Sequence, residues 1–138
     1  MIEPPPPPAI MKGRFSNYTG RIILINVIVF VLFYIASYLF GFEHMVSLFA
    51  LQPAAVMSGQ KIWTLVTSFF LHTQLWHLFV NMFSLYFVGN LLEKLIGGKR
   101  FLLLYLTSGL FAGIFWSVLS SWFTLTPVLE RVIGGPFI

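Results

Sequence analysis

A histidine and an asparagine stand one helical turn apart in a long apolar run, where both side chains could donate hydrogen bonds to a polar partner. His77 and Asn81 lie in the segment 75–92, which contains no Asp, Glu, Lys or Arg. The i, i+4 spacing places them on one face of a helix, and Ser84 continues that face. Polar groups at membrane depth are costly without a partner or water, so they indicate a functional site by default.

The composition requires that this helix belong to an integral membrane protein. Of the 138 residues, 58% are hydrophobic and only 9% are charged, whereas a soluble domain carries roughly 25% charged residues. This length allows one bundle of a few helices. The chain has no cysteine, which excludes a disulfide framework and a Cys-based metal site. The net charge of +4 does not form a nucleic-acid patch, and no nucleic-acid partner is expected.

Three stretches are long and apolar enough to cross a bilayer as helices: residues 22–40, 75–92 and about 101–123. The connection 42–74 is interrupted by charges, Pro and Gly, so it cannot be one span. Its apolar segment 62–71 is too short to cross, and this length is typical of a re-entrant or interfacial element.

Basic residues near the span ends predict the orientation. They cluster before the first span and in a charged loop at 93–100, while the connection 42–74 has only Lys61. By the positive-inside rule, the N-terminus and the 93–100 loop are cytoplasmic. Residues 1–20, with prolines at 4–8, are predicted to form a flexible cytoplasmic tail, and 21–138 to form the membrane domain. The C-terminal tail from 124 would lie outside the cytoplasm. We expect a multi-pass protein of the plasma (inner) membrane.

The third span carries small residues at helical spacing. Gly109 and Gly113 form one small-xxx-small face, and Ser108 and Ala112 form another. Such faces let two helices approach closely within lipid, where apolar surface provides no drive to associate. We interpret these four residues as helix-packing positions.

Taken in order, these and neighbouring motifs resemble the rhomboid intramembrane serine proteases. The similarity covers about 61–113: the run 63–72, His77-Leu78-Phe79-Val80-Asn81-Met82, Gly89-Asn90-Leu91-Leu92-Glu93 with Gly97, and the Gly-rich third span. The resemblance implies an all-α, six-helix membrane core around a water-filled cavity, of which three spans are present here. It also implies cleavage of transmembrane substrates by a Ser-His dyad, without a cofactor.

The resemblance also implies roles for single residues. His77 and Asn81 match positions that stabilise the oxyanion, and an amide or a neutral imidazole suits this role because it donates without repelling the developing negative charge. His72 matches a hydrogen-bonding support. Trp63 matches a loop anchor in the outer leaflet, although the family often follows it with Arg and this chain has Thr64. Glu93 matches an acidic position that ties helix ends together.

The family's nucleophile and base are not found in the 138 residues. No Gly-x-Ser-Gly occurs, and no histidine follows His77. We therefore expect the chain to be the N-terminal part of a protease, inactive by itself. Its partners would be the bilayer, transmembrane substrates and the missing C-terminal spans of the same chain.

Other interpretations compete with this one. His77 and Asn81 could be an ordinary interhelical hydrogen-bonding pair. A metal or haem site at His72 and His77 is disfavoured because residues five apart do not share a helical face and no carboxylate or Cys joins them. His44 suits a solvated loop. The chain could also be a non-catalytic rhomboid-like protein that binds or chaperones membrane clients, or a small structural membrane protein.

Overall fold

Three long apolar helices organise the chain, as the sequence predicts. The computed structural model describes residues 17–133, with side chains up to 123. Its candidate membrane spans are Tyr18–Phe40, Leu75–Ile96 and Gly98–Phe123. The described residues form helices and no strands, so the all-α transmembrane fold is confirmed. The proline-rich tail, apart from 17–20, and the basic residues within it lie outside the described residues.

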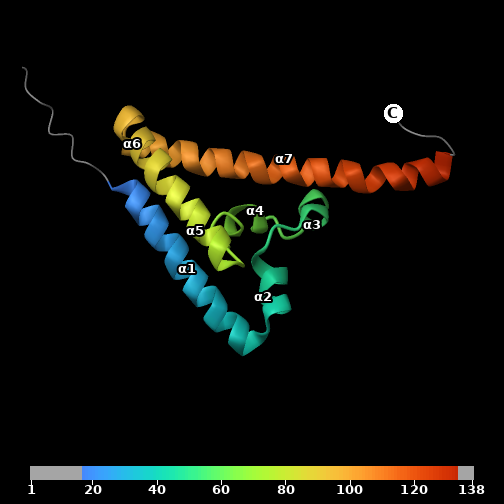
Figure 1. The fold of residues 1–138 in the computed structure, drawn as a ribbon. Coiled ribbons are helices and arrows are strands. Elements are labelled where there is room, and N and C mark those ends of the chain that lie inside the picture. Colours follow the sequence, from blue (N-terminus) through green and yellow to red (C-terminus); the bar gives the residue numbers. More distant parts are fainter. Residues whose placement is uncertain (1–16, 134–138) are drawn as a thin grey trace, which may run out of the picture.

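The first two spans lie side by side, and the third begins at the end where the second stops and runs away from the pair at an angle (Figure 1). α1 is Tyr18–Phe40, and the second span joins α5 (Leu75–Ser84), the π-helical segment η1 (Leu85–Gly89) and α6 (Asn90–Ile96). α7 runs from Gly98 to Ile133, so the tail predicted from 124 is helical at its start.

The charged loop predicted at 93–100 is wrong. α6 continues to Ile96 and α7 begins at Gly98, which leaves Gly97 as the whole connection. Gly97 has φ +84°, a left-handed conformation that glycine adopts without the steric cost a Cβ would bring. The helix extends past Glu93, whose carboxylate has partners on α1, as described below.

Three short helices make up the connection between the first two spans: α2 (Phe42–Phe49), α3 (Pro53–Met57) and α4 (Thr64–Thr67). α3 packs against α7, and α4 lies within the apolar segment 62–71. This segment consists of a short helix and turns.

Side-chain donors hold the connection together by binding backbone carbonyls. These bonds are Lys61 Nζ to Ser47 O (2.8 Å), Trp63 Nε1 to Leu48 O (3.0 Å) and Thr67 Oγ1 to Phe49 O (2.8 Å). Each one joins the 61–67 stretch to α2. The connection is therefore a folded layer rather than a loose loop, and it can fix the residues that follow it.

The interior of this bundle is unusually polar. Among the described side chains, the fully buried ones are Thr19, Asn26, Thr64 and Ser117. Most large apolar side chains of the three spans are exposed instead. The exposure of apolar side chains is what a bilayer favours, because lipid solvates apolar surface.

Candidate functional site

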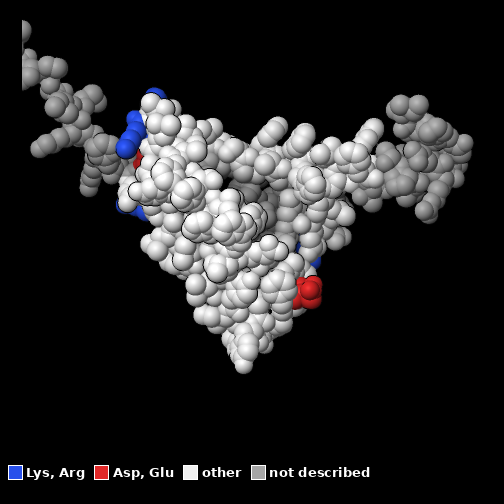
Figure 2. Space-filling model, viewed as in Figure 1, with Lys and Arg blue, Asp and Glu red and all other residues white. Residues whose placement is uncertain are grey.

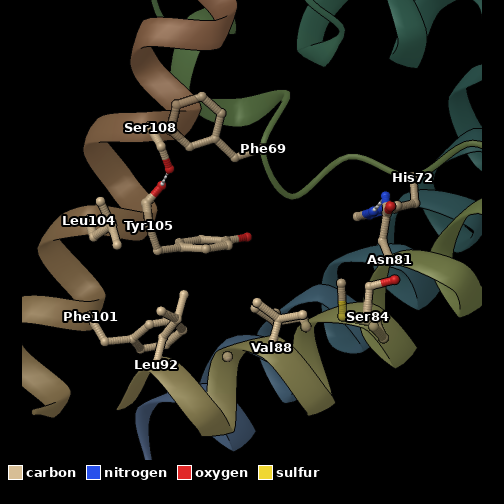
Figure 3. A pocket seen from close by; sticks show the side chains of 13 residues that line it. Phe69, His72, Asn81, Ser84, Val88, Leu92, Phe101, Leu104, Tyr105 and Ser108 are labelled. Carbon is tan, nitrogen blue, oxygen red and sulfur yellow. Dashed lines mark hydrogen bonds between the residues drawn. The ribbon is translucent and has the colours of Figure 1, made fainter. Parts of the chain in front are cut away.

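A cavity of about 440 Å³ lies between the second span and α7 (Figure 3). His72, Asn81 and Ser84 line one wall, and Tyr105 and Ser108 line the α7 wall. Phe69, Val88, Leu92 and Phe101 contribute apolar surface between them. The cavity therefore has polar groups on two sides within an apolar frame.

His72 and Asn81 form a hydrogen-bonded pair at the cavity wall (Figure 3). Asn81 Nδ2 lies 3.0 Å from His72 Nε2, and His72 Nδ1 lies 3.3 Å from the carbonyl of Phe70. One neutral tautomer satisfies both contacts, with Nδ1–H donating to the carbonyl and Nε2 accepting from the amide. The amide plane of Asn81 is thereby fixed, and its second N–H remains as a donor.

The environment of His72 favours this neutral form. His72 is 4% exposed, and burial lowers the pKa of its imidazole. The Phe70 carbonyl opposes this shift, and the nearby His77 adds slightly to it. Burial has the largest effect because a cationic ring loses its hydration there.

His77 lies outside the cavity wall and is exposed. Its ring centroid is 5.3 Å from that of His72. The two imidazoles are neighbours because His72 lies in the chain leading into α5 rather than on the helix, so the helical-face argument against a shared site was wrong. Among the described residues, no group of three His, Cys, Asp or Glu side chains could hold a metal ion.

Glu93 joins the second span to the start of α1. Its carboxylate accepts hydrogen bonds from the backbone N–H of Tyr18 (3.0 Å), the backbone N–H of Thr19 (2.9 Å) and the Thr19 hydroxyl (2.7 Å). The first N–H groups of a helix have no intrahelical acceptor, and a carboxylate there also complements the helix dipole. Gly89, one turn earlier, lets the helices approach, since a Cβ there would lie 3.0 Å from Thr19 Cγ2.

The small residues of α7 divide into a covered and an open face. A Cβ on Gly109 would lie 3.1 Å from the Phe69 ring, and one on Gly113 would lie 3.2 Å from Leu65 Cδ2. Ser108 and Ala112 are exposed. The glycine face thus receives the 64–69 segment, while the second face has no such cover among the described residues.

The predicted anchor Trp63 is 54% exposed, while its indole N–H is held by the α2 carbonyl of Leu48. Thr64, which stands where the family often has Arg, is fully buried and donates its hydroxyl to the Lys61 carbonyl at 2.7 Å. The Thr64 hydroxyl therefore points inward, toward the backbone of the connection.

The sequence did not assign a role to three polar residues that hold the helices together: Thr19, Asn26 and Tyr105. Thr19 binds Glu93, and Asn26 lies buried on α1 next to the Tyr105 hydroxyl. The available signal was a polar residue on the buried face of an apolar helix. It indicates a partner but cannot name one.

Comparisons with known proteins agree on one family. A family model described as the Rhomboid domain matches residues 59–134. Rhomboid protease GlpG of Haemophilus influenzae is 27% identical over 127 residues, covering 91% of this chain and 66% of that protein. Inactive RHOMBOID-like protein 8 of Arabidopsis thaliana is 39% identical over 61 residues, covering 44% of this chain and 17% of that protein.

Rhomboid protease GluP of Bacillus subtilis is 29% identical over 106 residues, covering 77% of this chain and 21% of that protein. The chain thus spans less than two thirds of the length of each of these relatives. No solved structure matches the chain.

Proposed function

Because the chain belongs to the rhomboid family, we propose that it is part of an intramembrane serine endopeptidase that cleaves transmembrane proteins. The serine nucleophile and the histidine base would lie outside these 138 residues. The proteases among its relatives support this proposal. The observation that carries it is the His72–Asn81 pair on a cavity wall.

In this proposal, Asn81 stabilises the oxyanion. Attack on a peptide carbonyl places negative charge on its oxygen, and a donor held in place beforehand stabilises that charge without reorganising. Asn81 meets this requirement because one N–H of its amide donates to His72 Nε2, with 3.0 Å between the nitrogens. His72 acts as a positioning residue through this contact.

His77 contributes less directly. Its ring is exposed and lies beyond the cavity wall, so it must turn toward the carbonyl to donate. Rotamer changes of exposed side chains take picoseconds to nanoseconds, which makes such a turn compatible with catalysis. We therefore assign His77 as a supporting donor and Asn81 as the principal one.

The proposed orientation in the membrane places the N-terminus in the cytoplasm. Four of the basic residues within 17–133, namely Arg21, Lys94, Lys99 and Arg100, lie where α1 begins and α6 meets α7, as the positive-inside rule expects of a cytoplasmic end. The cavity would then open toward the opposite side, beneath the connection between the first two spans. We propose the plasma (inner) membrane as the location.

A non-catalytic rhomboid-like protein that binds membrane clients is the second candidate. It is favoured by the inactive relative among the matches. Sequencing the gene past the codon for Ile138 separates the two proposals. An open frame containing Gly-x-Ser-Gly and a later transmembrane histidine supports the protease.

The catalytic assignment is tested in the protein encoded by that full frame. We expect Asn81→Ala to lower the rate constant for cleavage of a fluorescent transmembrane substrate about 100-fold, the usual cost of losing an oxyanion donor. His77→Ala should lower it less. His44→Ala is the matched control, because His44 is exposed on α2, away from the cavity.

Two results would contradict the assignment. Full activity of Asn81→Ala would show that its amide does not meet the oxyanion. A loss of activity that follows the loss of folded protein, measured by circular dichroism, would assign the His72–Asn81 pair to packing.

A further inference from the structure

A second hollow lies at the other end of the second span, away from the cavity. It has a volume of about 580 Å³ and is bounded by the start of α1, by η1 and by α6. Its polar lining residues are Asn17, Asn90 and Lys94, and its apolar or aromatic lining residues are Tyr86, Phe87 and Leu91. One groove thus combines a cation, two amides and an apolar wall.

The polar rim is arranged to meet an anion. Lys94 lies in the last turn of α6 and is exposed, and its ammonium offers three donors. Asn17 caps α1 by accepting from the Gly20 N–H through Oδ1 at 3.0 Å, which leaves its amide N–H₂ as a further donor. The adjacent Glu93 carboxylate accepts hydrogen bonds from the backbone of α1 and is not among the residues that line the groove.

The charge around the groove reinforces this preference. Figure 2 shows Lys and Arg side chains gathered at the end where α1 begins and α6 meets α7. Arg21, Lys99 and Arg100 are exposed there, and Lys61 is the only other Lys or Arg among residues 17–123, whose side chains are described. Basic grooves between helices at a membrane interface bind anionic lipid headgroups.

The wall of the groove distinguishes a lipid from a soluble anion. Tyr86, Phe87 and Leu91 are each 57% exposed, and they lie on the span, within reach of an acyl chain. A free phosphate would gain nothing from them. We infer that this groove binds one anionic glycerophospholipid, with its phosphate at Lys94 and Asn17 and an acyl chain along the aromatic wall.

Native mass spectrometry of the full 138-residue chain in neutral detergent tests this inference. We expect one phosphatidylglycerol to be retained in preference to phosphatidylcholine. Lys94→Gln should weaken phosphatidylglycerol binding about fivefold, the effect of one basic residue near an anionic lipid. Lys94→Arg should retain binding. Lys99→Gln is the matched control, because it removes the same charge at the same end but outside the groove.

Three results would overturn the inference. Equal losses in Lys94→Gln and Lys99→Gln would mean that lipid responds only to overall charge. Unchanged binding in Lys94→Gln would exclude the groove. Displacement of the lipid by inorganic phosphate at equal concentration, together with no effect of Leu91→Asn, would identify an anion site without an acyl-chain component.

Discussion

Replacing Glu93 with alanine should detach the start of α1 from the second span. The carboxylate accepts three hydrogen bonds from two consecutive residues, Tyr18 and Thr19, at 2.7–3.0 Å. Two of these donors are backbone N–H groups of the first helical turn, which have no other acceptor within the helix. The substitution therefore removes both a contact between spans and the acceptor for a helix end.

The size of the effect follows from these contacts. A hydrogen bond to a charged group contributes about 1.5–3 kcal/mol to stability. Because Glu93 is only half-buried, water can replace part of what the two backbone donors lose. We therefore expect Glu93→Ala to lower the free energy of unfolding by about 3 kcal/mol, less than the sum of three such bonds. Thr19→Val removes only the hydroxyl donor, and we expect a loss of about 1 kcal/mol.

The assay is reversible unfolding of the full chain in mixed micelles, followed by far-ultraviolet circular dichroism. The single variants and the double variant Thr19→Val/Glu93→Ala form a double-mutant cycle. The hydroxyl bond exists only when both partners are present, so the double variant should be about 1 kcal/mol less destabilised than the sum of the single variants. Glu43→Ala, on the exposed start of α2, is the control for loss of a carboxylate.

Two outcomes would refute this reasoning. A loss below about 0.5 kcal/mol in Glu93→Ala, the range of ordinary surface substitutions, would mean that water satisfies α1 as well as the carboxylate does. Strict additivity in the cycle would mean that Thr19 and Glu93 do not interact in the folded protein.

Further predictions concern packing and pH. Gly109→Leu should lower the free energy of unfolding by about 1–3 kcal/mol through overpacking, because a Cβ at this position would lie 3.1 Å from the Phe69 ring. Ala112→Leu, on the exposed face of α7, should lower it much less in the same assay, and equal effects would contradict the division into a covered and an open face. Because the pKa of His72 is lowered on folding, the unfolded chain binds a proton more readily, so stability should be constant above about pH 6.5 and fall as the pH drops below that value. His72→Gln should lack this component when unfolding is measured from pH 7.5 to 5, and an unchanged pH profile in that variant would exclude His72 as its source.

The spans were predictable because a stretch of about 20 residues without charged side chains can be recognised in the sequence itself, whatever the rest of the chain does. The first span begins at Tyr18 rather than at 22, and the second ends at Ile96 rather than at 92. The added helical residues include Thr19 and Glu93, which bond to each other. In the sequence alone, the charge of Glu93 indicates the end of a helix. In the folded chain, its carboxylate is bound by Thr19, which lies 74 residues earlier, and the helix continues past it.

The site was only partly predictable for a similar reason. The i, i+4 spacing of His77 and Asn81 was visible in the sequence. The partner of Asn81, however, is His72, which lies in the connection before α5 and is placed beside Asn81 by the fold of that connection. The choice between two small-residue faces on α7 was also hidden, because it depends on where Phe69 and Leu65 lie. Spacing describes one helix, whereas these contacts depend on the connection between two spans.

The π-helical segment η1 separates the two ends of the second span. His77 and Asn81 precede it, and Glu93 follows it. A π turn accommodates an extra residue in a helix, and one residue corresponds to about 100° of rotation in an α-helix. Deleting one residue from 85–89 would therefore turn Glu93 away from α1 while Asn81 still faced His72. The number of residues in η1 therefore sets the rotation of α6 relative to α5. An insertion or deletion in η1 would separate the Asn81–His72 contact from the Glu93–α1 contact without replacing any of these residues.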